Sequence, residues 1–421
     1  MGNRVRTLPV LLVVLGLCSL FKTGVSAVRG EMGWFYPETP RIAAMPARAK
    51  TEDTLPAHDR VVAVAAGESF SMALTRSGRV FAWGSNDHGQ LGNGTTRDSA
   101  VAVAVGGLPT SERIVAIAAG GVSAYALTKS GAVYAWGSDG FGDLGDGTTS
   151  DSATPVRVKG LPAHDPAIGL PPGGTLAVTR AGHIYFWGVP VQGAGGLAHG
   201  RTAARVRGLP ANDPAIAAAD GYDYDLALTR SGRVYAWGFN GFGALGTGDF
   251  QDTTVARAVP LQSAPMVAIA AVSGHSMAID GHGSVYVWGF VLDGSSTGDP
   301  QQAYTTPYRM PGLPVDDPAV GIAAGAYHSV VVTRTGHLYA WGANDRGQLG
   351  NGARGSATPV PVLGAGTIGP VMAVSSGNGQ NVAVTRAGRV YAWGFNDLGQ
   401  LGDGSHNNSA TAVLVRGLPA A

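Results

Sequence analysis

The chain has 421 residues, of which 65 are glycine and only 14% are charged, and its formal net charge is +1. So small a charge gives no strong global field, and the sequence therefore predicts neither nucleic acid nor an anionic membrane surface as a partner. Because 45% of the residues are apolar, the glycine excess indicates many tight turns around a large core and excludes a disordered chain.

The first residues have the pattern of an export signal. Arg4 and Arg6 precede the apolar stretch Leu8–Phe21, and the small residues Val25-Ser26-Ala27 suit cleavage by a signal peptidase. The apolar stretch is shorter than the roughly 20 residues of a membrane span. We therefore expect residues 1–27 to be a signal peptide and the protein to be secreted or extracytoplasmic. The alternative is an uncleaved N-terminal anchor, because Lys22 stands close to the apolar stretch.

No disulfide is expected to stabilise the mature protein. The single cysteine, Cys18, lies in the signal segment, and residues 28–53 form an extension whose role the sequence does not indicate. Residues 54–421 must therefore be stabilised by their core, which a closed repeat architecture can provide.

From residue 54 onward the sequence repeats seven times. Seven of the eight tryptophans stand in a Trp-Gly pair, and the steps between them are 53, 51, 50, 51, 53 and 52 residues. These residues are Trp83, Trp136, Trp187, Trp237, Trp288, Trp341 and Trp393. A Phe or Tyr two residues before each Trp lies on the same strand face, and we interpret these pairs as core between repeats.

Each unit divides into four pieces of strand length. In the second unit these pieces are Ile114–Ala119, Ala124–Thr128, Val133–Trp136 and the stretch around Pro155–Val158, with a tight turn at Lys129-Ser130-Gly131. The strands are apolar on both faces, as expected when every sheet is covered by its neighbours. With no helical period anywhere, the repeat predicts an all-β, seven-bladed β-propeller with four-stranded blades.

The units share the pattern A-A-G-x-x-x-S-x-A-L-T-x-S-G-x-V-Y-A-W-G-x-N-x-x-G-Q-L-G-x-G, which is similar to the repeat of the regulator of chromosome condensation family. The resemblance covers about residues 54–421 and implies seven blades. It also implies that each fourth strand joins the blade of the following repeat, so that Thr411–Val415 would fasten the ring beside repeat one. Repeats three and five depart from the pattern at Pro171–Gly174, Val189–His199 and Val291–Gly298, where we expect different loops on the same fold.

The loop after the first strand differs in every repeat and is our candidate binding site. Its fourth position is, in chain order, Phe70, Ser123, Gly174, Tyr224, His275, His328 and Gln380. Rigid strands fix the loop ends, and Tyr, His and Asp on a rigid ring suit recognition of a protein. The predicted partner-binding residues are Phe70, Tyr222, Tyr224, Asp225, His275, Tyr327 and His328. Drift of unselected loops is the alternative, and the pairs His275-Ser276 and His328-Ser329 also match a His-Ser/Thr pair of the family that could be structural.

We predict no catalytic residue, no metal site and no cofactor. Loops such as Asn86–Gly94 are rich in oxygen ligands, but they lack the bidentate Glu of the best-known calcium loop, and Asn, Asp and Gly also suit left-handed turns. The ten histidines show no metal-binding spacing. An enzyme would need groups that converge at the channel mouth, and Asp223, Asp225, His275 and His328 are the only candidates.

Basic residues gather on the opposite face of the predicted disc, in the hairpins between the second and third strands. They are Arg76, Arg79, Lys129, Arg180, Arg230, Arg233, Arg334, Arg386 and Arg389. Aspartates of the Gly-Leu-Pro connections, Asp59, Asp165, Asp213, Asp316 and Asp317, partly neutralise them. A nucleic-acid site normally shows an uncompensated basic stripe, so we predict none here.

We predict a secreted, monomeric, protein-binding propeller that is not an enzyme and that acts as an interaction or inhibitory module. The sequence does not identify its protein partner. One alternative is guanine-nucleotide exchange, the activity of the family's namesake, although no basic tail is present. A secreted propeller enzyme is another. Light sensing, as in the plant ultraviolet-B receptor of the same fold, is excluded because every repeat tryptophan occupies the Trp-Gly core position.

Overall fold

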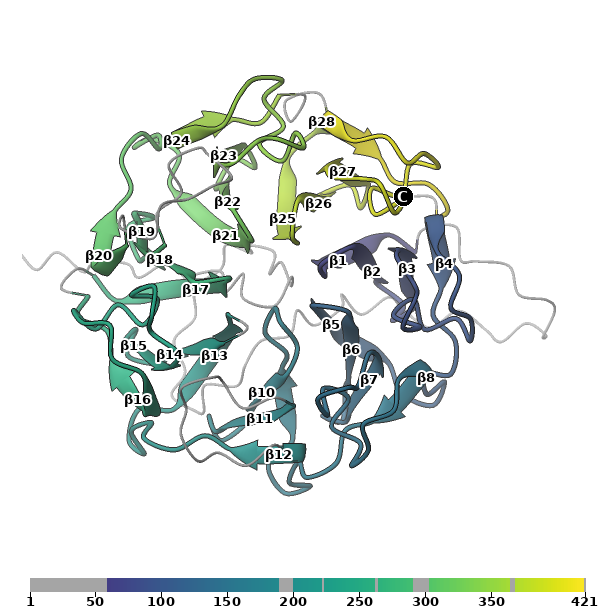
Figure 1. Ribbon diagram of the computed structural model, residues 1–421, viewed down its shortest axis with the longest axis horizontal. Helices are drawn as coiled ribbons and strands as arrows, with labels where there is room; N and C mark the ends of the chain where they lie inside the picture. The colour runs from purple at the N-terminus through teal and green to yellow at the C-terminus, as the bar shows by residue number, and fades with distance from the viewer. Residues whose placement is uncertain are drawn as a thin grey trace, which may run out of the picture.

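The computed structural model describes residues 59–188, 200–221, 223–261, 264–290, 303–363 and 368–419. In these residues 28 strands form seven four-stranded antiparallel sheets, set as blades around a central axis (Figure 1). The predicted all-β, seven-bladed propeller is therefore confirmed. The described part of the chain holds no helix of the length and apolarity that crossing a membrane would require.

The four strands of each blade run outward from the axis in the order of the sequence (Figure 1). The innermost strands are β1 (Val61–Ala66), β5 (Ile114–Gly120), β9 (Ala167–Gly169), β13 (Ala215–Asp220), β17 (Met266–Val272), β21 (Ala319–Gly325) and β25 (Val371–Ser376). The second strands are β2 (Phe70–Thr75), β6 (Ser123–Thr128), β10 (Leu176–Thr179), β14 (Tyr224–Thr229), β18 (His275–Asp280), β22 (His328–Thr333) and β26 (Gln380–Thr385).

The two outer strands of each blade follow in the same order. The third strands are β3 (Val80–Gly84), β7 (Val133–Gly137), β11 (Ile184–Gly188), β15 (Val234–Gly238), β19 (Val285–Gly289), β23 (Leu338–Gly342) and β27 (Val390–Gly394). The fourth strands are β4 (Ser99–Ala104), β8 (Ser152–Arg157), β12 (Gly200–Arg205), β16 (Thr253–Ala258), β20 (Tyr304–Arg309), β24 (Ser356–Pro361) and β28 (Ser409–Leu414).

The core lies between blades, because each sheet covers the next. Every residue of β2, for example, is buried, and its Met72 and Leu74 pack in one cluster with Ile114 and Trp136 of the second blade. Burying such side chains contributes about 1.5–3 kcal/mol each. The apolar pattern on both faces of the inner strands is thus a consequence of stacking.

Five of the seven repeat tryptophans donate a hydrogen bond to the loop of the preceding blade. Trp136 is fully buried and its Nε1 donates to Gln90 O at 3.0 Å. The same bond joins Trp83 to Gln400 O, Trp187 to Asp143 O, Trp288 to Ala244 O and Trp393 to Gln348 O, at 2.8–3.0 Å. The tryptophans are therefore core between repeats, as predicted. The aromatic residue two positions earlier is buried at Phe81 and only half-buried at the other six positions.

The expected exchange of fourth strands between repeats is wrong. β28 pairs with β27 of its own repeat, with Leu414 opposite Tyr391. Each repeat, counted from its innermost strand, therefore forms one complete blade and lends no strand to the next. Blades seven and one are joined instead by single bonds, such as Trp83 Nε1 to Gln400 O at 2.9 Å and Ala102 N to Arg416 O at 3.0 Å.

The two divergent repeats keep the fold, as expected. Repeat three forms the complete sheet β9–β12, although β9 has only three residues, and repeat five forms β17–β20. The Pro-Gly loop of repeat three turns toward blade two, where Gly173 N donates to Ala119 O at 3.1 Å. The two other divergent segments, 189–199 and 291–298, lie outside the described residues.

Candidate protein-binding face

The two faces of the disc carry different connections. Because neighbouring strands are antiparallel, the loops after the first and third strands emerge together on one side, which we call the loop face. The hairpins between the second and third strands and the connections between blades emerge on the other side, which we call the hairpin face.

Most of the predicted binding residues are buried within the loop face. Phe70, Tyr224, His275 and His328 are between 0% and 2% exposed, and Asp225 is also buried. Their expected contact with a partner is therefore wrong as stated, since a partner cannot reach these side chains. Tyr327 is 43% exposed, as the prediction requires, and Tyr222 lies outside the described residues. Whether a partner binds this face stays a prediction.

A glycine three residues earlier accounts for the burial of Phe70, Tyr224 and His328, whereas His275 has Val272 at that position. A Cβ at Gly67, Gly221 or Gly325 would collide with the ring of Phe70, Tyr224 or His328, respectively. The ring therefore packs against the glycine of its own loop, in the space that a side chain there would occupy, and does not point to solvent. This spacing, Gly-x-x-large residue, is a signal in the sequence that identifies the position as internal.

These buried polar groups form a belt of hydrogen bonds that runs from blade to blade. Tyr224 Oη donates to His275 O at 2.5 Å, and His275 Nε2 lies 3.3 Å from Ser329 Oγ. His328 Nε2 lies 2.8 Å from Asn381 Oδ1. Gln380 Nε2 extends the belt to blade one by donating to the carbonyl oxygen of Gly67 at 2.9 Å. In blades four to seven the variable fourth position thus serves one structural task by different residues, joining neighbouring blades.

The belt fixes the state of its two histidines. Asn381 Nδ2 donates to Gln348 O, so its Oδ1 is an acceptor and His328 carries its proton on Nε2. Burial lowers the pKa of His328 to about 4 although the Asn381 bond opposes the shift. Burial, with repulsion from His328, lowers the pKa of His275 to about 3. Both rings are therefore neutral at neutral pH.

The carboxylates considered for catalysis do not join the histidines in a reactive set. Asp225 stands opposite Asp220 in the β13–β14 pair, and burial, with the charge of Asp220, raises its pKa well above the usual range. Burial also raises the pKa of Asp223. Among the described residues no group of three His, Cys, Asp or Glu side chains is placed to hold a metal ion.

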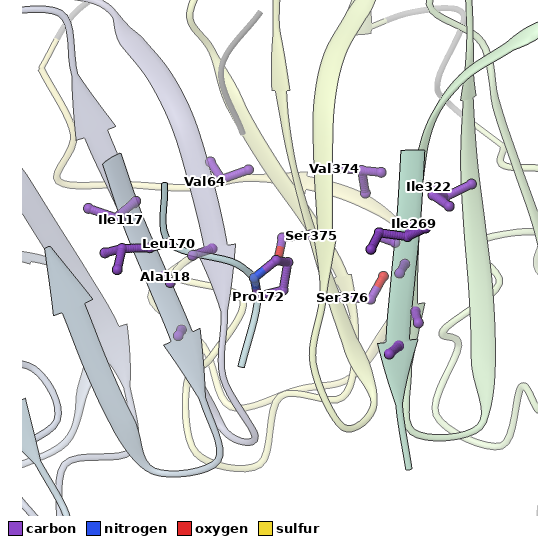
Figure 2. Close-up of a pocket in the computed structure, with 16 residues that line it drawn as sticks. Val64, Ile117, Ala118, Leu170, Pro172, Ile269, Ile322, Val374, Ser375 and Ser376 are labelled. Carbon is purple, nitrogen blue, oxygen red and sulfur yellow. The ribbon is translucent and has the colours of Figure 1, made fainter. Parts of the chain in front are cut away.

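The central channel is lined mostly by apolar side chains. It holds a cavity of about 50 Å³, and Figure 2 shows Val64, Ile117, Ile269, Ile322 and Val374 around it. The hydroxyl groups of its lining come from Ser375 and Ser376. Such a lining offers packing between the inner strands, and no acid, base or nucleophile with a shifted pKa.

Besides Tyr327, the loop face exposes aromatic residues at positions that our sequence analysis missed. Phe141 is 65% exposed and Phe242 is 38% exposed, each in the loop after a third strand. The same loop position, two residues after a buried Asn or Asp, is His88, Arg346 and Leu398 in other blades. Variation at one exposed position of a regular loop was the available signal. Phe242 also packs edge-on against Phe239 and Phe290, with ring centroids 5.8 and 6.1 Å away.

These loops are held rigidly by the buried Asn or Asp. Asn240 Oδ1 accepts the amide of Leu245 at 3.0 Å, and its Nδ2 donates to Asp249 O at 2.9 Å. The same Leu amide bond recurs from Asn86, Asp139, Asn344 and Asn396 at 2.8 Å. The oxygen atoms considered as calcium ligands are thus turn-forming groups in these blades.

The loop face is acidic. The five fully described loops between third and fourth strands contain eleven Asp and three Arg. Two ion pairs there, Arg346 with Asp397 at 3.6 Å and His88 with Asp151 at 2.7 Å, are largely exposed and compensate little of this charge. Aromatic side chains on a rigid acidic surface suit a partner with basic and apolar groups.

The fold and the loops define a closed repeat propeller whose core is constant and whose exposed loop positions vary. The profile of the RCC1-like domain matches residues 175–420, and profiles of the regulator of chromosome condensation (RCC1) repeat match residues 61–90, 114–143, 77–127 and 130–169. The chain therefore belongs to the RCC1-like domain family, which confirms the resemblance seen in the repeat.

Relatives of several kinds share this propeller. The ultraviolet-B receptor UVR8 of Arabidopsis thaliana is 31% identical over 360 residues, which are 85% of this chain and 70% of the receptor. The human E3 ubiquitin-protein ligase HERC2 is 30% identical over 83% of this chain, but the match spans 7% of the ligase.

Solved structures show the same fold. Prp20p of Saccharomyces cerevisiae, a protein described with its binding to Gsp1p and histones, has a TM-score of 0.71 and 22% identity and covers 83% of this chain and 86% of its own. Human WBSCR16 has a TM-score of 0.67 and 22% identity, over 81% and 91% of the two chains. At this identity the likeness extends to the fold alone.

Proposed function

We propose that this chain is a protein-binding propeller that holds its partner on the loop face, centred on Phe242 and Tyr327 of blades four to six, with Phe141 as a second contact. The observation that carries the proposal is the exposure of these aromatic side chains on the loop face, where Phe141 and Phe242 stand on loops fixed by a buried Asp or Asn and Tyr327 stands in the short turn between β21 and β22. Rigid aromatic residues bury a large area at little entropic cost, which is why they dominate protein interfaces.

The family supports binding over catalysis. Prp20p is described as binding Gsp1p and histones, and a further structure holds Prp20 with Kap60. Guanine-nucleotide exchange on a GTPase is the alternative use of the same propeller. The acidic charge of the loops and the neutral, hydrogen-bonded state of His275 and His328 favour a binding surface over an active site.

The first test captures the partner by photocrosslinking. A benzophenone amino acid at position 242 should give a crosslinked adduct with a protein from the natural environment of the chain. The control position is Val315, which is 91% exposed in a connection on the hairpin face. Adducts from position 315 and none from 242 or 327 would move the site to the hairpin face.

The second test measures the captured partner. We expect Phe242→Ala and Tyr327→Ala each to weaken binding by about 1–3 kcal/mol, because hot-spot aromatics typically carry that much. Tyr327→Ala should leave the melting temperature nearly unchanged. Equal binding by the double variant would contradict the proposal.

The location of this function is a further part of the proposal. Arg4, Arg6 and the apolar stretch Leu8–Phe21 support export, after which residues 1–27 would be removed. Mass spectrometry of the protein from its own host should find an N-terminus near Val28 outside the cytoplasm. Intact Met1 or Gly2 in a soluble cytoplasmic fraction would refute export without touching the proposed binding face.

A further inference from the structure

The hairpin face carries a regular ring of cations around the channel mouth. The first hairpin residue of each blade donates its amide to the residue that precedes the innermost strand, at 2.9–3.0 Å in all seven blades. The seven donors are Arg76, Lys129, Arg180, Arg230, Gly281, Arg334 and Arg386, so that six of the seven are cationic. In blades one and two the accepting residues, Arg60 and Arg113, are cationic as well.

At two blade boundaries an arginine side chain of this inner ring contacts the backbone of the next ring residue. Arg60 Nη1 lies 3.5 Å from Arg386 O, and Arg386 Nη2 donates to Arg334 O at 3.2 Å. Arg60 of blade one thus reaches the backbone of blade seven, and Arg386 of blade seven reaches the backbone of blade six. Apart from the half-buried Arg60, the cations of the ring are exposed.

No carboxylate pairs with the inner ring among the described residues, because the acidic groups of this face are used elsewhere. Asp59 accepts the amide of Ser77 at 2.8 Å and its hydroxyl at 2.6 Å. The equivalent residues Asp165, Asp213 and Asp317 cap the hairpins of their own blades in the same way.

The positive excess is greatest at blades seven and one. Blade seven has Gly369 where five of the other six blades have an acid, so Arg386 and Arg389 have no carboxylate of their own blade beside them. The neighbouring blade adds Arg60 and Arg76 against the single charge of Asp59. A formal net charge of only +1 for the whole chain, with an acidic loop face, means that the disc is polarised along its axis.

We propose that the inner ring binds a compact polyanion with several phosphate groups, seated over the channel mouth against Arg334, Arg386, Arg60 and Arg76. Guanidinium groups match phosphate oxygens in a fork geometry, and unpaired exposed arginines have donors free to do so. A ring around one axis lets a small multivalent ligand contact several cations at once. A nucleic-acid duplex, which is long and straight, would contact only an arc of the ring.

Blade five supplies a direct test of the geometry. Gly281 stands at the one ring position without a cation, it is exposed, and a Cβ there would meet its nearest atom, Pro265 O, at an ordinary 3.7 Å. Gly281→Arg therefore completes the ring without strain. We expect it to tighten the binding of inorganic tripolyphosphate about threefold or more, whereas Gly281→Gln should leave the affinity unchanged.

The loss experiment uses titration calorimetry with tripolyphosphate at low salt. The double variant Arg60→Gln/Arg386→Gln should weaken binding by about 30-fold or more, since each charged contact typically accounts for about tenfold. Arg97→Gln, an exposed arginine of the loop face, is the matched control and should bind like the native chain. Orthophosphate should bind at least about tenfold more weakly than tripolyphosphate, because it cannot span the ring.

Three outcomes would overturn the inference. The first is that Arg97→Gln loses as much tripolyphosphate binding as Arg60→Gln/Arg386→Gln. The second is that Gly281→Arg melts like the native protein but binds tripolyphosphate no more tightly. The third is that a 20-base-pair duplex binds more tightly than tripolyphosphate at the same salt concentration. The last result, if abolished by Arg60→Gln/Arg386→Gln, would assign the ring to nucleic acid instead. None of these outcomes bears on the loop face, so the proposed function is tested separately.

Discussion

At the scale of single residues, burial decides what a side chain does. The fourth position of the first loop varies as a recognition site would, yet Phe70, Tyr224, His275 and His328 all lie inside the belt between blades. The residue types alone did not reveal this, because Tyr and His are common both in interfaces and in buried hydrogen-bond networks. For Phe70, Tyr224 and His328 the glycine three residues earlier did carry the information, since it leaves the space that each ring fills.

The two belt histidines predict a loss of stability in acid. Their pKa values in the folded protein, about 3 and about 4, lie below the value of about 6.5 of an unfolded histidine. The unfolded state therefore takes up protons first, and the free energy of unfolding should fall as the pH drops from about 6.5 toward 4. The expected slope is up to about 1.4 kcal/mol per pH unit for each histidine. Asp139, Asp223 and Asp225, whose pKa values are raised by burial, act in the opposite direction, so the slope due to the histidines is measured against a variant that lacks them.

Urea unfolding at pH 7, 5.5 and 4.5 measures this slope. The matched variant is His275→Gln/His328→Gln, because blade seven has Gln380 at the same position and shows that glutamine fits the belt. The double variant should lose stability less steeply between pH 7 and 4.5 than the native chain. Parallel curves for the two proteins would show that these histidines do not titrate on unfolding.

At the scale of elements, the sequence predicted the strands and turns of a blade, but it did not predict which loop residues are buried and which are exposed. The pieces Ile114–Ala119, Ala124–Thr128 and Val133–Trp136 correspond to β5, β6 and β7, because apolar runs between glycine turns leave little choice. The loop after the third strand is fixed by one buried Asn or Asp, and this role cannot be separated from metal binding by residue type alone. The exposure of Phe141 and Phe242 follows from that loop geometry.

Two glycines in the loop between β3 and β4 allow the cost of backbone strain to be distinguished from the cost of a steric clash. Gly92 and Gly94 both have positive φ, +64° and +78°, so alanine is strained at either position by about 1–2 kcal/mol. A Cβ at Gly92 would lie 2.6 Å from Trp136 Nε1, whereas one at Gly94 meets no atom within 4 Å. Gly92→Ala should therefore destabilise the protein by about 1–3 kcal/mol more than Gly94→Ala. Equal midpoints in denaturant would contradict the packing of the tryptophan against this loop.

At the scale of the whole molecule, blade number followed from the tryptophan spacing, but ring closure did not. Seven near-equal steps require seven equal units, and units of four strands each form one blade of a closed ring. The repeat has no natural first strand, however, so the sequence is compatible with blades that begin at any of the four. The structure begins each blade at the innermost strand, and β28 consequently stays with β27.

The observed closure predicts that the junction of blades seven and one can be strengthened by moving the chain ends. A circular permutant that begins at Ser409 and joins Pro419 to Asp59 by a flexible linker would place β28 at its N-terminus. Opening the ring would then require breaking the β27–β28 ladder, in which Ala392 faces Val413. We expect slower unfolding in denaturant than for the unpermuted residues 59–419.

The matched control is a permutant with the same linker that begins at Val315, which is exposed and lies between blades five and six. Every blade of this control is continuous, so its ring closes by side-chain packing and loop bonds, as in the native order. It should unfold at a rate close to that of residues 59–419. If the Ser409 permutant unfolds as fast as the control, the junction of the two ends is not where the ring opens, because a ladder added there would otherwise have slowed it.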